Sequence, residues 1–415
     1  MKYLVASVAI ILFCIPKINL ISIGNYNAGI RVDDFLVALF AIIYIGDRFI
    51  KRSSKISQAE AWFLVYLLVV TISVIANGFI FGRGSMLFPL RFFEYFVFLY
   101  IGFIYSAYSL SLEKILKVLF LSNVITAYLQ AAGVIGGFTV YGYRPDVSGR
   151  VIGLTGGPWE LGALMNFLSC YYLINSKSTA GKYAAIGVAM SVILLTGSRM
   201  SFLAEVLVIL AYTISVSGVK KALKRVLFIL PVIFISVYSF EESVVAKRSE
   251  SLLTIENVSA IQEYYDSVIV HNGIPSWDEI GKVSREDIDA SWGMRVLKWI
   301  FAVKLFFTSI GYVLFGVGAG AYGNALDGGW LRILTESGTI GFYAFLQFFL
   351  SVRKISPTFK LICLAFAVNM LMIDIYMSYK VMALFLFLAG IYIKQNALDQ
   401  STIRLLNQKN NLALT

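Results

Sequence analysis

A small set of arginines and one aspartate could together perform group transfer on a phosphorylated lipid. Arg199 and Arg295 each stand at the start of an apolar run, and Asp327 shortly precedes another. Arginine binds phosphate oxygens through paired hydrogen bonds and keeps its charge in a low dielectric. A carboxylate facing such arginines could accept a proton from a sugar hydroxyl while they hold a pyrophosphate leaving group. These three residues are therefore the predicted catalytic set.

Each of these residues also has an ordinary structural explanation. Asp327 could cap the helix that follows it, and on chemistry alone the two interpretations are level. Arginines at span ends often anchor helices among lipid headgroups. We favour that role for Arg31 and Arg83, and ligand binding for Arg199, at a helix N-terminus, and for Arg295. The predicted substrate-binding set comprises Arg91, Arg144, Arg150, Arg332 and Glu336, with Trp299 and Trp330 as sugar-stacking aromatics that could equally belong to interfacial belts.

Carboxylates inside apolar runs are costly in a membrane and therefore attract attention. Glu94 follows Arg91 by one turn, so an ion pair along one helix explains it. Glu205 lies inside an apolar run, where it could orient an arginine or belong to a polar pocket. Asp374 could do the same with Lys380. None of these carboxylates separates an enzyme from a transporter.

Three further motifs are interpreted as coincidental. His271 is the only histidine, and without a second histidine or a cysteine cluster the sequence predicts no zinc site. Asp287 and Asp289 match the D-x-D pattern of metal-dependent sugar transferases but lie in a generally acidic segment. The glycines of 318–323 spell G-x-G-x-x-G without the strand that a dinucleotide site requires. We therefore expect no metal and no cofactor.

The composition is that of a membrane protein. Of the 415 residues, 59% are hydrophobic and 14% are charged, whereas a soluble domain has roughly a quarter charged residues. The net charge of +11 reflects basic residues that recur in alternate short loops, which is the asymmetry that orients spans in a bilayer and not a nucleic-acid footprint. The three cysteines, Cys14, Cys170 and Cys363, lie in apolar runs and are interpreted as buried hydrophobes.

The pattern predicts an all-α polytopic membrane protein with about twelve spans, and both termini in the cytoplasm. Residues 1–240 would hold spans 1–9, and 331–393 would hold spans 10–12. Between them, 241–330 would form a large external loop before the third-last span, with 295–314 as an amphipathic helix on the outer membrane surface. Residues 394–415 would be a cytoplasmic tail.

In motif order and topology, the chain resembles the O-antigen polymerase and O-antigen ligase superfamily. The first motif is Leu194–Arg199 (LLTGSR), and the second is Arg295-x3-Trp299 followed by 314–320 (LFGVGAG). The third is Asp327-Gly-Gly-Trp330-Leu331-x4-Glu336-x-Gly338-x2-Gly341. The segment 153–162 (GLTGGPWELG) is similar to the family's entry to the corresponding span.

This resemblance implies a GT-C-like helical fold and metal-independent glycosyl transfer from undecaprenyl pyrophosphate on the periplasmic face of the bacterial inner membrane. Arg199 and Arg295 match positions expected to hold the pyrophosphate or its sugar. Asp327 stands where ligases usually carry a histidine, which favours a polymerase of oligosaccharide repeat units. A ligase that moves polymer onto a lipid A core, and a transporter or flippase for lipid-linked glycan, are the alternatives. Expected partners are the lipid-linked glycan, membrane lipid, a chain-length regulator and a flippase, with no nucleic acid.

Overall fold

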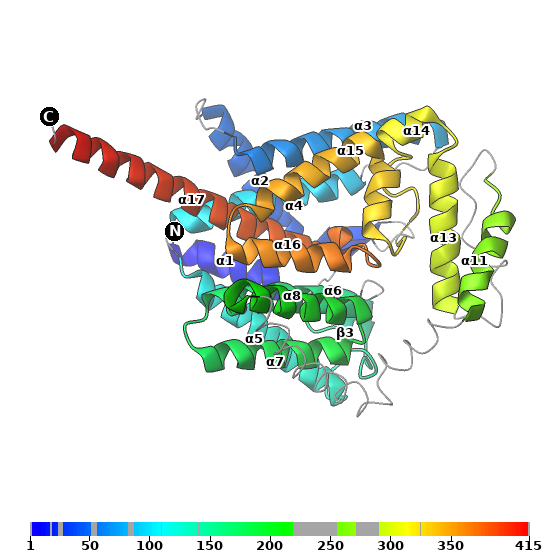
Figure 1. Cartoon of the computed structure of the whole chain (residues 1–415), viewed down its shortest axis with the longest axis horizontal. Helices are drawn as coiled ribbons and strands as arrows, with labels where there is room; N and C mark the ends of the chain where they lie inside the picture. The colour runs from blue at the N-terminus through cyan, green and yellow to red at the C-terminus, as the bar shows by residue number, and fades with distance from the viewer. Residues whose placement is uncertain are drawn as a thin grey trace.

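The fold is described from a computed structural model of the chain, shown in Figure 1. The structure describes residues 2–16, 19–23, 28–50, 56–81, 87–108, 110–139, 142–218, 255–270, 290–323 and 325–413. The predicted ninth span at 226–238 lies outside these ranges, as do Arg83, His271, Asp287 and Asp289.

The described chain is mostly helical. The first helices are α1 (Lys2–Cys14), α2 (Val32–Ile50), α3 (Gln58–Phe81), α4 (Leu87–Ala107), α5 (Leu112–Ala131), α6 (Pro158–Asn175), α7 (Thr179–Thr196) and α8 (Arg199–Ser217). They are followed by α11 (Ile255–Ser267), α13 (Ala290–Phe306), α14 (Ile310–Phe315), α15 (Gly329–Arg353), α16 (Pro357–Asn369), the 3-10 helix η1 (Ile375–Met377) and α17 (Tyr379–Ala413). Two antiparallel hairpins pair β1 (Asn19–Ile23) with β2 (Ala28–Arg31), and β3 (Gly137–Thr139) with β4 (Gly142–Arg144).

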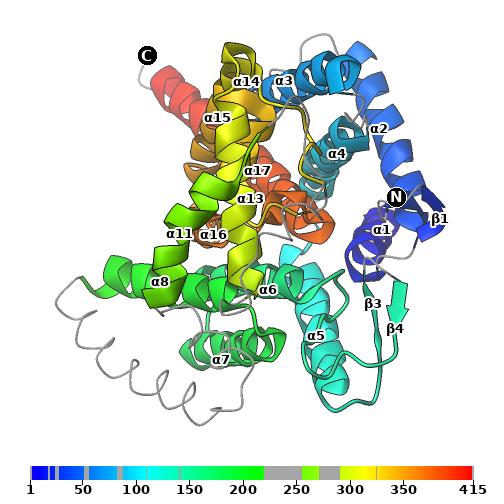
Figure 2. The ribbon, with the colours of Figure 1, turned by 90° about the vertical axis from the view of Figure 1, so that its right-hand side faces the viewer.

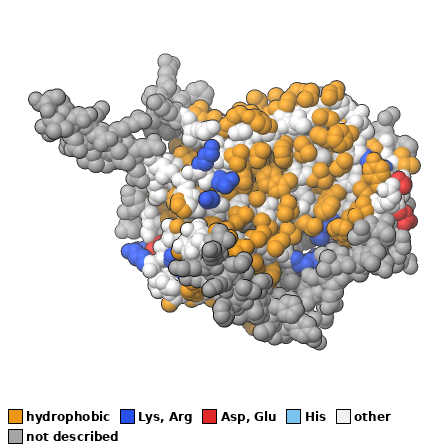
Figure 3. Space-filling model, viewed as in Figure 1, with side chains coloured by type: hydrophobic (Ala, Val, Ile, Leu, Met, Phe, Trp, Pro, Cys, Tyr) orange, Lys and Arg blue, Asp and Glu red, His pale blue; other side chains and the backbone are white. Residues whose placement is uncertain are grey.

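The helices have the length and composition of a membrane protein. Within the described ranges, α3, α4, α7, α8 and α15 are long and apolar enough to cross a bilayer, and α16 is a shorter apolar helix. Apolar side chains gather over much of the described surface in Figure 3, with few charges between them. Such a surface suits lipid and not water. The described part of the chain is therefore mostly helical and has the character of a membrane protein.

The backbones of α4 and α17 approach each other closely. A Cβ added to Gly102 of α4 would lie 2.2 Å from the Phe387 carbonyl oxygen, and one added to Gly390 of α17 would lie 2.0 Å from that of Leu99. Small residues allow such close backbone approach between membrane helices. Beyond this contact α17 continues unbroken to Ala413 (Figure 1), so the predicted start of a tail at residue 394 is not a break in the helix.

Helix α15, which contains the predicted span at 331–352, is interrupted at Gly338 (φ 70°, ψ 179°). The backbone N–H of Val317 donates to the Thr335 carbonyl (2.9 Å), and that of Gly318 donates to the Glu336 carbonyl (3.0 Å). The segment after α14 therefore satisfies carbonyls that the interruption releases, as a lipid environment requires. The interruption separates 329–337, which directly follows Asp327, from the longer second part of α15.

Replacing Gly338 with alanine is expected to lower the free energy of unfolding by several kcal/mol, about 3. The new Cβ would lie 2.2 Å from the Leu314 carbonyl oxygen, at a backbone φ of 70° that side chains disfavour. Gly187→Ala in α7 is the matched control, because a Cβ there meets nothing within 4 Å; it should be neutral or gain about 0.5–1 kcal/mol. Thermal unfolding of the two purified variants checks this, and equal midpoints would contradict it.

Helix α13 lies across the end of the bundle, beside α11, as the turned view of Figure 2 shows. Its buried residues Leu297 and Phe301 form a second apolar cluster with Tyr264 of α11 and with Tyr322 and Leu326 of the segment before α15. The predicted amphipathic helix at 295–314 is thus divided into α13 and α14. The apolar face of α13 packs on α11 and on the segment before α15, whereas α14 has no buried residue and exposes Ile310.

Candidate functional site

Asp327 has an unusual backbone conformation. Among the described residues it is the one non-glycine residue with positive φ (59°). The residue that caps α15 is Gly328, with no side-chain cap hydrogen bond, so the alternative explanation of Asp327 as the helix cap is wrong. Aspartate enters the left-handed region more readily than most residues, but at some cost. Strain of this kind persists only where surrounding structure imposes it, and it clusters at functional sites.

The carboxylate of Asp374 imposes this conformation. It accepts hydrogen bonds from three successive backbone N–H groups, those of Leu326 (2.8 Å), Asp327 (3.3 Å) and Gly328 (3.0 Å). Asp374 is buried, in the turn after α16. The predicted partnership of Asp374 with Lys380 is not what the structure contains. The ammonium of Lys380 instead donates to the carbonyls of Phe13 (2.8 Å) and Ile15 (2.5 Å).

Arg332 holds this scaffold together from inside. Its side chain is 0% exposed and pairs with Asp374 (2.8 Å) and with Glu336 (3.0 Å). Its Nη2 also donates to the Gly323 carbonyl (2.6 Å), before the Asp327 turn. Arg332 and Glu336 are both buried and pair with each other. This arrangement favours a role in positioning the turn over the predicted role in binding substrate.

Helix α13 contributes the partly exposed residues that contact the Asp327 turn. The Arg295 Nε lies 3.3 Å from Asp327 Oδ2, and these side chains are 20% and 35% exposed. Lys298 Nζ donates to the Ala325 carbonyl (3.0 Å) and Trp299 Nε1 to that of Leu326 (3.1 Å). Burial lowers the pKa of Lys298, and the nearby Asp327 carboxylate partly offsets this effect. Two predicted catalytic residues, Arg295 of α13 and Asp327 of the turn before α15, thus meet at the surface.

The two predicted sugar-stacking tryptophans have different surroundings. Trp330 donates to the Ala367 carbonyl (3.0 Å), and its ring packs edge-on against Phe342, Phe345 and Phe349. This enclosure favours a packing role for Trp330 over the predicted stacking on sugar. Trp299 is half-buried against the Asp327 turn, where a Cβ on Gly328 would lie 2.9 Å from its Nε1.

Arg199 lies at the start of α8, at the same end of the bundle as Asp327. Two residues later, Ser201 Oγ donates to Asn369 Oδ1 (2.9 Å), and the next carbonyl, that of Met370, accepts from the N–H of Trp330 (3.3 Å). The turn after α16 therefore contacts both helix N-termini. Arg199 itself is half-buried. Arg150 Nε donates to the Thr196 carbonyl (3.0 Å), which holds the 145–157 loop against the α7–α8 corner.

The remaining predicted residues lie apart from Asp327 in the fold. Arg144 is exposed in β4, and Arg91 is half-buried on α4. Glu94 pairs with Arg31 (2.5 Å) and not with Arg91 as predicted, because β2 brings Arg31 against α4. Arg31 is 3% exposed and lies over the Tyr379 ring (3.8 Å), so its predicted role as a headgroup anchor is wrong.

Glu205 belongs to a buried polar network inside the bundle. Of its two predicted roles, this matches membership of a polar pocket and not the orientation of an arginine. It accepts hydrogen bonds from Asn166 Nδ2 (2.9 Å) and Ser169 Oγ. Asn166 in turn accepts from Asn369 Nδ2 (3.0 Å), so the network joins α6, α8 and α16 just below the turn that carries Asp374. Amide and hydroxyl donors satisfy this carboxylate without an arginine among the described residues.

The sequence matches no protein-family model, and a search of curated proteins finds no significant match.

Proposed function

We propose that this chain is a membrane glycosyltransferase that polymerises oligosaccharide repeat units carried on undecaprenyl pyrophosphate. In this proposal it has about twelve spans and lies in the bacterial inner membrane with both termini in the cytoplasm. The Asp327 end of the bundle faces the periplasm, and 241–330 forms the large loop of a GT-C-like fold. A chain-length regulator and a flippase are its expected partners.

The Asp327–Arg295 pair is the observation that carries this proposal. The partly exposed carboxylate of Asp327, whose backbone has a positive φ, lies 3.3 Å from the partly exposed guanidinium of Arg295. A buried scaffold of three charged residues, Arg332, Glu336 and Asp374, fixes the turn beneath it. Catalytic groups must be held in a productive geometry by rigid surroundings. A purely structural surface ion pair contributes little stability and would not need such a scaffold.

In the proposed reaction these residues have the following roles. A hydroxyl of the incoming carrier-linked unit attacks the anomeric carbon of the growing chain, and Asp327 accepts the hydroxyl proton. The bond from that carbon to the pyrophosphate oxygen breaks, and undecaprenyl pyrophosphate leaves with the electron pair. Arg295, and Arg199 at the N-terminus of α8, stabilise the charge on the leaving group. No metal takes part in this scheme.

A transporter for lipid-linked glycan is the second candidate, because one observation favours it. Transporters often contain interrupted helices near buried charges, and α15 is interrupted at Gly338 close to Arg332. Here, however, the N–H groups of Val317 and Gly318 donate to carbonyls near the interruption, and Arg332 pairs with two carboxylates. These groups are therefore already bonded within the protein, which favours the enzyme. The ligase alternative differs from a polymerase only in its acceptor.

Arginine variants in a deletion strain test the proposal. Arg199→Ala and Arg295→Ala, at normal protein levels, are each expected to shorten the surface polysaccharide ladder toward a single repeat unit attached to the core. Loss of one preorganised donor typically costs about 10²–10³ in rate. Arg353→Ala, exposed at the far end of α15, is the matched control and should restore full-length polymer.

Two results would overturn the proposal. An unchanged ladder in both variants would make the pyrophosphate assignment wrong. Bare core with long lipid-linked polymer in the deletion strain would indicate a ligase.

A further inference from the structure

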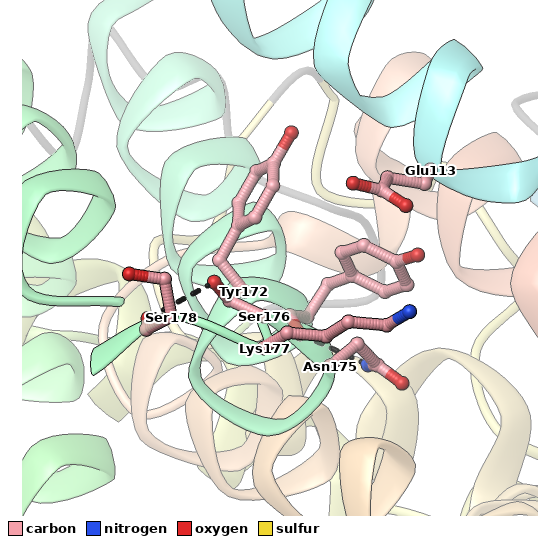
Figure 4. Close-up of a pocket in the computed structure, with 7 residues that line it drawn as sticks. Glu113, Tyr172, Asn175, Ser176, Lys177 and Ser178 are labelled. Carbon is pink, nitrogen blue, oxygen red and sulfur yellow. Dashed lines mark hydrogen bonds between the residues drawn. The ribbon is translucent and has the colours of Figure 1, made fainter. Parts of the chain in front are cut away.

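A cavity opens beside the loop between α6 and α7 (Figure 4). Helix α6 begins near the candidate site, where Glu160 accepts from Ser378 Oγ, and ends at the cavity with Asn175. The cavity measures about 370 Å³, within the usual range of small-molecule sites of about 300–1,000 Å³. Its lining comprises Glu113, Tyr171, Tyr172, Asn175, Ser176, Lys177 and Ser178.

The cavity presents opposite charges that do not neutralise each other. Glu113 projects from α5 and Lys177 from the 176–178 loop, on different sides of the cavity. Among the described residues, neither forms an ion pair within 4 Å. Lys177 lies just before the N-terminus of α7, whose dipole also favours an anion. The two sides therefore suit a ligand with an ammonium at one end and a phosphate at the other.

The surroundings suit a ligand that is itself a lipid. Helix α7, a candidate span, begins at Thr179 immediately after the loop, so the cavity lies where a span ends. Further along α5 from Glu113, past the exposed Lys117, Leu121 and Ile125 are four residues apart and therefore neighbours on the helix surface. Leu121 and Ile125 are 44% and 57% exposed. An acyl chain can lie along this apolar row while its headgroup occupies the cavity.

We propose that this cavity binds the zwitterionic amine–phosphate headgroup of a membrane phospholipid, with Glu113 holding the ammonium and Lys177 the phosphate. Ser178 contributes a hydroxyl beside the phosphate, because its oxygen accepts from the N–H of Gly181 (3.3 Å) and its hydrogen can be donated. Pockets with basic residues between helices at a membrane surface are a recurrent setting for headgroups. This site is independent of the chemistry at Asp327.

Lipid retention by the purified full-length protein tests the proposal. Native mass spectrometry with added phosphatidylethanolamine should show retention by the wild type, and about tenfold weaker retention by Glu113→Gln and by Lys177→Gln. Lys114→Gln changes a charge beside Glu113 but outside the cavity lining, and should retain the lipid. Phosphatidylglycerol, which has the phosphate but no amine, should bind the wild type less and Glu113→Gln relatively better.

Other outcomes would overturn the proposal. Equal retention by all variants, with unchanged thermal unfolding, would mean that the cavity is not the binding site. Equal binding of both lipids, sensitive only to Lys177→Gln, would mean that the amine is not recognised. Displacement of the lipid by free phosphoethanolamine at an equal headgroup concentration would assign the site to a soluble ligand.

Discussion

Replacing Asp327 with asparagine is expected to abolish polymer formation while the protein accumulates at its normal level. Asparagine tolerates the positive φ of this position (59°) about as well as aspartate does. It keeps the shape of the side chain but cannot accept a proton as a base. Loss of a general base typically costs about 10²–10⁴ in rate. The length distribution of surface polysaccharide, read with the protein level, measures the effect.

Two variants separate chemistry from folding at this position. Asp327→Gly removes the backbone strain together with the carboxylate, so it should be at least as stable as the wild type and still inactive. Asp146→Asn removes another carboxylate, from an exposed loop where Ser148 donates to it (2.7 Å), and should leave the ladder intact. A wild-type ladder from Asp327→Asn would show that Asp327 is not the base.

Replacing Arg332 with methionine is expected to lower the free energy of unfolding by about 3–5 kcal/mol. The guanidinium is 0% exposed and compensates two buried carboxylates, Glu336 and Asp374. Without it, two negative charges remain in a low dielectric, and the turn that carries Asp327 loses its support. Denaturation of the purified protein in mixed micelles, followed by helical circular dichroism, measures the loss.

A compensated variant distinguishes charge balance from simple packing. Arg332→Met combined with Glu336→Gln and Asp374→Asn removes all three charges and should recover part of the lost stability. Its activity should stay low, because the Asp374→Asn change leaves a single side-chain oxygen to accept from the three turn N–H groups. A single Arg332→Met variant as stable as the wild type would contradict the scaffold.

The class of the protein and much of its exposed site could be predicted from sequence. Apolar runs of span length predict membrane helices because a bilayer core leaves few alternatives. Asp327 and Arg295, from the predicted catalytic set, and Trp299, from the predicted sugar-stacking residues, meet at one turn. Arg199, the third predicted catalytic residue, lies at the same end of the bundle at the start of α8. Asp327 lies just before α15, where local sequence determines position well, whereas Arg295 and Trp299 lie within α13, so the tertiary fold brings them to the turn.

The buried scaffold could not be predicted in the same way. Arg332 and Glu336 are four residues apart, a spacing that predicts a pair on one helix face but does not indicate whether that face is exposed or buried. Their third partner, Asp374, belongs to another helix–turn segment, so only the tertiary fold brings it near. The ion pair of Arg31 and Glu94 could not be predicted for the same reason, because the β1–β2 hairpin brings Arg31 to a residue of α4 that is distant in sequence. The interruption at Gly338 depends on a non-local contact as well.

Reconstitution of the purified chain in vesicles with undecaprenyl-pyrophosphate-linked repeat units tests the central claim most directly. The account predicts a ladder of lipid-linked products and release of undecaprenyl pyrophosphate, both in the presence of EDTA and both absent with Asp327→Asn. Movement of single repeat units between leaflets with no ladder would contradict the account and identify the chain as a transporter.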